Sequence, residues 1–151
     1  MENDFENAKK LVEATIRKIG LDPANCRASS GSSTSAGQAA WTLKRGSASV
    51  LVAVTKREDE GVAYLRVASP VVTLPADPAR HEALFRKLLE LNAAGLANAA
   101  FGLMGDRVVV VSERPVAGLD EGEVDQTVRH LAAVADTFDD RLERDFGATR
   151  A

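Results

Sequence analysis

The stretch that most constrains the fold is residues 77–146, which reads as a helix, a β-hairpin and a second helix. Asp77 and Pro78 form a helix start, because aspartate accepts a backbone N–H there and proline suits the first helical position. Gly95 supplies the left-handed residue that often follows a helix, so we expect this helix to end near residues 92–94. Its apolar stripe consists of Leu84, Leu88 and Leu91.

This helix is wider on its apolar side than one contact requires. A helix that packs on a single core needs one apolar stripe. Phe85 and Leu89 broaden the stripe on one side. We therefore expect a second contact, made with a partner subunit.

The hairpin that follows contains a strand without the usual alternation. Residues 96–104 alternate weakly, Gly105 suits a tight turn, and residues 108–111 are four consecutive valines. A continuous β-branched run indicates that both faces of the strand are covered. Together with the wide helix, it predicts an interface with a second copy or a partner at Phe85, Leu88, Leu89, Val109 and Val111.

The last helix carries the clearest start signal of the chain. Asp120 and Glu123 have the spacing of a capping box. Large apolar residues recur at helical spacing over residues 124–142, which predicts the face that packs on the sheet. The opposite face is mostly acidic, and we expect its carboxylates, Asp139 and Asp140 included, to be solvated.

The first half of the chain predicts one helix and three strands. A helical stripe spans residues 5–19, and strands follow at residues 39–45, 50–54 and 62–67. Proline interrupts the third strand at residues 69–70, and residues 71–74 are an expected extension of it as an edge segment. Residues 28–37 are rich in Ser, Gly and Thr, which predicts a flexible loop. The predicted fold class is α+β: an antiparallel five-stranded sheet with three helices, in the order α-βββ-α-ββ-α, forming one domain over residues 1–151.

Charge and composition exclude several classes of function. The net charge of -3 disfavours direct nucleic-acid binding through a basic surface. A single cysteine, Cys26, allows no intrachain disulfide and fits a reducing compartment. The sequence contains no apolar run near the ~20 residues that span a bilayer, and its N-terminus lacks the pattern of a signal peptide. We expect a cytoplasmic protein without membrane contact.

No residue pattern indicates catalysis, a metal site or a cofactor. His81 and His130 lie in different predicted helices, without neighbouring His or Cys at ligand spacing. The serines near residue 30 lack a nucleophile elbow, and the glycines match no phosphate-binding loop. Trp41 has two interpretations: a core residue, or a partner-binding anchor if its strand face is exposed.

The element order and the second half of the chain resemble the YbjN-like proteins and, more distantly, the type III secretion chaperones. The features that carry the resemblance are Leu91-Asn92 at a helix end, the small-residue strand at 96–103, the valine strand, the segment at 115–119 that leads into the last helix, and the long final helix itself. The resemblance implies a compact α+β domain that dimerises and binds other proteins without enzymatic activity. YbjN-like proteins are described as sensory-transduction or stress regulators.

Residues and resemblance together favour a non-catalytic homodimeric module that binds an unidentified protein partner, in a chaperone-like or regulatory role. Two alternatives stay open at this point. One is a small-ligand sensor that holds its ligand between sheet and helices. The other is a true effector chaperone of a type III secretion system.

Overall fold

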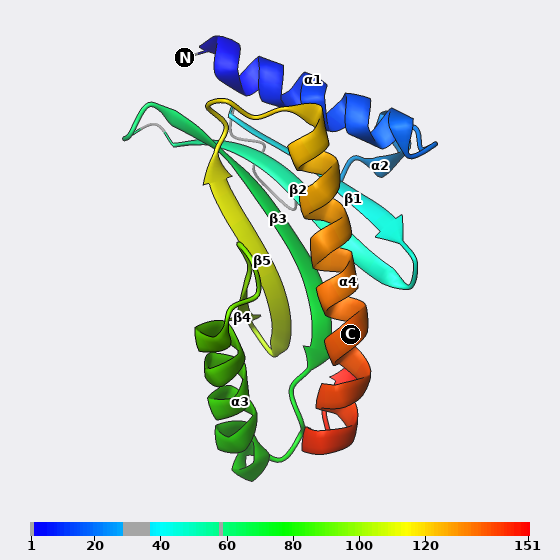
Figure 1. The fold of residues 1–151 in the computed structure, drawn as a ribbon, viewed down its shortest axis with the longest axis vertical. Helices are drawn as coiled ribbons and strands as arrows, with labels where there is room; N and C mark the ends of the chain where they lie inside the picture. Colours follow the sequence, from blue (N-terminus) through cyan, green and yellow to red (C-terminus); the bar gives the residue numbers. More distant parts are fainter. Residues whose placement is uncertain (1, 29–36, 58) are drawn as a thin grey trace.

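An antiparallel sheet with a long helix across one face organises the computed structural model, which describes residues 2–28, 37–57 and 59–151 (Figure 1). The helices are α1 (Glu2–Lys18), α2 (Pro23–Cys26), the 3-10 helix η1 (Pro78–Arg80), α3 (His81–Ala94) and α4 (Glu121–Phe146). The strands are β1 (Gln38–Arg45), β2 (Ala48–Arg57), β3 (Val62–Thr73), β4 (Ala100–Met104), β5 (Arg107–Pro115) and β6 (Thr149–Arg150).

The strands lie in the order β1-β2-β3-β5-β4, and the short β6 pairs with the end of β3. Helix α4 crosses β2, β3 and β5, while α1 packs beside α4 (Figure 1). Helix α3 lies at the other end of the molecule, next to β4. The predicted α+β class and the order of its main elements are confirmed, and α2, η1 and β6 are small additions to it.

The core fills the layer between the sheet and helices α1 and α4. One face of each strand alternates into this layer, so that Trp41 lies opposite Val52, which in turn lies opposite Val67. Its largest fully buried side chains are Trp41, Ile16, Leu43, Leu65, Leu84, Leu131 and Leu142. Side chains therefore occupy the position at which the sensor hypothesis places a ligand.

Helix starts and ends follow the sequence signals closely. The Asp120 side chain accepts from the Glu123 N–H at 2.8 Å and the Glu123 side chain accepts from the Asp120 N–H at 3.0 Å, which confirms the capping box. Gly95, with φ of 100°, ends α3 as predicted. Asp77 caps η1 by accepting from the Ala79 N–H at 3.0 Å, and α3 itself begins at His81 rather than at residue 78.

The expected extension of the third strand past Pro70 is confirmed up to Thr73, but the interruption is only a register shift, and the extension pairs with β5 and β6 instead of forming an edge. Strand β3 continues past Pro70, with a register shift between Pro70 and Val72. Ser69 is buried, and its hydroxyl donates to the Ser49 carbonyl oxygen at 2.8 Å. A bulge accommodates the missing proline donor without ending the strand.

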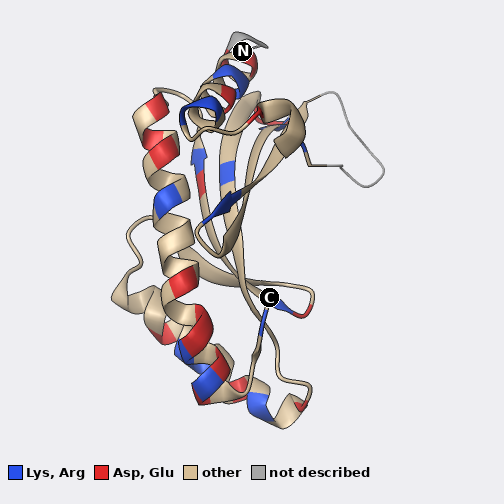
Figure 2. Ribbon diagram, turned by 90° about the vertical axis from the view of Figure 1, so that its right-hand side faces the viewer, with Lys and Arg blue, Asp and Glu red and all other residues tan. Residues whose placement is uncertain are grey.

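Charged residues recur along α4, and many of them are acidic (Figure 2). The prediction that Asp139 is solvated is wrong, because this side chain is only 7% exposed. Strand β6 brings Arg150 to 3.1 Å from Asp139 and 2.8 Å from Asp140. The charge of Asp139, followed by that of Asp140, raises the pKa of Arg150. The predicted loop at 28–37 falls largely on residues 29–36, which lie outside the described residues.

Candidate functional site

One face of α3 is anchored in the core and the other is open. Leu84 and Leu88 belong to the core, with Leu88 5% exposed. On the other side Leu89 is 69% exposed, and Phe85 is half-buried against the His81 ring. These side chains border a shallow groove of about 650 Å³. We call this surface the α3 face; it consists of Glu82, Phe85, Arg86, Leu89, Glu90 and Ala93.

The structure does not bring the five predicted interface residues together. Phe85 and Leu89 share the α3 face. Leu88 lies in the core and supports that face from within the protomer. Val109 and Val111 alternate with core valines, so they are on the sheet face away from α4, where Val109 is buried and Val111 is half-buried.

The interpretation of Trp41 as a partner-binding anchor is wrong. Its side chain is 0% exposed, because the strand face that carries it is covered by the helical layer. Within the described ranges, its indole N–H has no hydrogen-bond acceptor. Trp41 is a core residue, which was the other interpretation.

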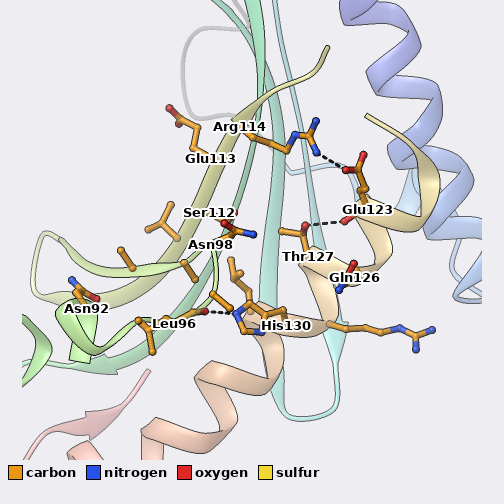
Figure 3. Close-up of a pocket in the computed structure, with 17 residues that line it drawn as sticks. Asn92, Leu96, Asn98, Ser112, Glu113, Arg114, Glu123, Gln126, Thr127 and His130 are labelled. Atoms are coloured by element: carbon orange, nitrogen blue, oxygen red, sulfur yellow. Dashed lines mark hydrogen bonds and ion pairs between the residues drawn. The ribbon is translucent and has the colours of Figure 1, made fainter. Parts of the chain in front are cut away.

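A larger groove of about 1070 Å³ lies between three segments that are distant in sequence (Figure 3). The segments are the loop at 95–99, the second half of β5 and the first turns of α4. We call it the β5 groove. Val111 lines it, and its uncharged polar side chains are Asn92, Asn98, Ser112, Gln126, Thr127 and His130.

Charged side chains on the β5 groove are paired within the chain. Arg114 lies 2.8 Å from Glu123, and the Glu113 carboxylate lies 3.0 Å from Arg57 and 3.1 Å from Arg66. Arg129, further along α4, pairs with Asp125 at 3.0 Å. The groove therefore presents compensated charges beside neutral hydrogen-bonding groups.

Both histidines connect loops to the body of the fold. His130 Nε2 lies at hydrogen-bond distance from the Leu96 carbonyl oxygen, which fixes the loop that borders the β5 groove (Figure 3). His81 Nε2 lies 2.7 Å from the Pro75 carbonyl oxygen. Across the described residues, no group of three or more His, Cys, Asp or Glu side chains is placed to hold a metal ion. In the same part of the chain, no helix is both long and apolar enough to cross a membrane.

Asn92 is a structural residue that the sequence interpretation missed. Its carboxamide donates to the Phe101 carbonyl oxygen at 3.1 Å and accepts from the Phe101 N–H at 2.7 Å. One side chain thus substitutes for a neighbouring strand at this point of β4. The available signal was the Leu-Asn pair at the helix end. Sequence alone does not show that the Asn92 side chain binds the backbone of Phe101, nine residues later.

Comparison with known proteins defines the class to which this architecture belongs. A sequence model described as T3SS (YopN, CesT) and YbjN peptide-binding chaperone 1 matches residues 28–151. The match covers most of the chain, so the protein belongs to this family of peptide-binding chaperones. The resemblance seen in the sequence is thereby confirmed. Among curated protein sequences, none matches this chain.

Solved structures of three protein complexes each contain a chain with a similar fold. A chain of the ExsC-ExsE complex superposes with a TM-score of 0.60 at 18% identity, over 89% of this chain and 92% of that one. A chain of the HopA1-SchA chaperone-effector complex gives 0.57 at 13% identity, over 93% and 97%. A chain of the ExoU-SpcU complex from Pseudomonas aeruginosa gives 0.58 at 14% identity, over 87% and 98%. At identities this low, the superpositions establish likeness of fold alone.

Proposed function

We propose that this protein is a non-catalytic chaperone-like module that acts as a homodimer and holds an extended segment of a partner protein. Membership of a peptide-binding chaperone family supports the binding of an extended partner segment. The open α3 face supports the homodimer. The free thiol of Cys26 suits a cytoplasmic location.

The observation that carries the homodimer is Leu89, 69% exposed beside Phe85 on a helix whose other side is already anchored. A two-fold symmetric interface sets the same surface of two copies against each other. The α3 face suits this arrangement, because Arg86 and Glu90 give it both signs of charge around an apolar centre. Related by a two-fold axis, the arginine of one copy can face a glutamate of the other.

An extended segment is the kind of partner that this molecule can accommodate. Peptide recognition by a sheet edge or a helical groove needs exposed backbone or an open apolar surface, and the protein presents both. The β5 groove also opens to solvent between the loop at 95–99, β5 and α4, so a chain segment from outside can enter it. These features support a binding role toward unfolded or extended polypeptide.

Selection of peptides from a random library tests this function directly. The intact protein is immobilised, panned against phage-displayed dodecapeptides, and the enriched sequences are synthesised for titration calorimetry. We expect sequences that converge and bind with one peptide per protomer in the micromolar range. Recovery of only those phage that also bind the bare matrix would contradict a peptide-binding role.

A further inference from the structure

Asn92 closes the outer edge of β4. Its carboxamide forms hydrogen bonds with both the N–H and the C=O of Phe101, so these two backbone groups point away from β5. Exposed backbone at a sheet edge is where a further strand can add. An incoming strand could not pair with Phe101, because Asn92 already binds both of its backbone groups.

The direction of the β5 backbone groups follows from the same contact. In an antiparallel ladder, pairs that exchange backbone hydrogen bonds alternate with pairs that do not. Phe101 and Val110 form a pair that exchanges no backbone hydrogen bonds, because the backbone groups of Phe101 bind Asn92. The neighbouring residues of β5, Val109 and Val111, therefore direct their backbone groups toward β4. Glu113 lies two residues further along β5 and directs its N–H and C=O to the same edge.

Strand β4 ends before it reaches Glu113. Its first residue, Ala100, pairs with Val111. Ala97 and Asn98, separated from Ala100 by one residue, have left-handed φ values of 53° and 62°. This bend takes the chain away from the line of β4 and leaves the β5 groove beside Glu113 (Figure 3). Among residues placed in the structure, none hydrogen-bonds to the Glu113 backbone on this edge.

Arg114 closes the same edge on the other side of Glu113. Its Nε donates to the Pro115 carbonyl oxygen at 3.1 Å, and its Nη2 donates to the Ala117 carbonyl oxygen at 3.2 Å. The open stretch of edge is therefore short and centred on one residue. It lies on a groove rather than on a flat surface.

We propose that the edge of β5 at Glu113 is the docking point where an extended, uncharged segment of a partner protein adds as a short strand. This inference rests on the proposed function and names its contact point. Main-chain hydrogen bonds would supply affinity, and the groove walls would select side chains. An ionic ligand is disfavoured because the Arg114–Glu123 and Arg129–Asp125 pairs already neutralise the nearby charges.

A pair of substitutions at Glu113 separates the backbone from the side chain. Glu113→Pro removes the N–H that faces the groove, while the ladder to β3 stays intact because that N–H is not part of it. Glu113→Ala is the matched control: it loses the contacts with Arg57 and Arg66 but keeps the N–H. Fluorescence of the buried Trp41 verifies that both variants are folded.

Titration of a library-selected peptide then gives distinguishable outcomes. We expect Glu113→Pro to weaken binding about tenfold or more, from the lost hydrogen bond and the bulk of the ring, and Glu113→Ala to bind within about twofold of the parent. Equal affinity for all three proteins would overturn the site but leave the function standing. No peptide binding by the parent protein would instead overturn the function.

Hydrogen exchange of the parent protein gives a second measurement that needs no variant. The Glu113 amide should exchange rapidly in the free protein and become protected when the peptide is bound. Protection confined to the α3 face would overturn the proposal. A change of molar mass in Glu113→Pro without a change in peptide affinity would also overturn it, because the occupant of the edge would then be a second copy.

Discussion

Replacement of Asn92 by alanine removes both hydrogen bonds that close the β4 edge. Phe101 is only 7% exposed, so its backbone groups lose their partner in a largely buried setting. Two hydrogen bonds contribute about 2 kcal/mol net, and the better helix propensity of alanine returns roughly 0.5 kcal/mol. We expect Asn92→Ala to lower the free energy of unfolding by about 1.5 kcal/mol.

Urea unfolding followed by Trp41 fluorescence measures this loss, since the tryptophan is fully buried in the folded state. For a slope of about 1–3 kcal/mol/M, the midpoint should fall by roughly 0.5–1.5 M with the slope unchanged. Asn7→Ala is the control, because Asn7 is an exposed residue of α1. An Asn92→Ala midpoint equal to that of Asn7→Ala would refute the reasoning.

Three further outcomes follow from named contacts. Leu89→Asp should weaken dimerisation at least about 30-fold in sedimentation equilibrium, because each copy loses roughly 1–2 kcal/mol of apolar burial, while Lys87→Asp, off the α3 face, should not. Arg150→Ala should lower the urea midpoint, and in an Asp139→Asn background the same change should do much less, since the buried charge is gone. Gly147→Ala should cost about 1 kcal/mol in thermal unfolding, because φ at this residue is 69°.

Local signals predicted the parts of the fold that depend on neighbouring residues. The capping box at Asp120 and the helix end at Gly95 need only a few adjacent positions, and both are confirmed. The alternation around Trp41 correctly indicated a strand. Which face of that strand is covered depends on helices elsewhere in the chain, and for this reason core and interface stayed open until the structure placed α4.

Two of the misses have a long-range cause, and one has a local cause that the sequence pattern did not reveal. Asp139 lies on an acidic helical surface and is buried because β6 returns from the C-terminus with Arg150. Strand β3 survives Pro70 because a bulge and the Ser69 hydroxyl compensate locally. The β5 groove was not predicted at all, since its walls come together only after the sheet has formed.

The central claim is that the open α3 face meets a second copy of the chain. Light scattering of the unmodified protein across micromolar concentrations tests it most directly. The account predicts a molar mass of twice the 16.0 kDa of one chain, falling toward the single-chain value on dilution. A mass of 16.0 kDa throughout that range would contradict it.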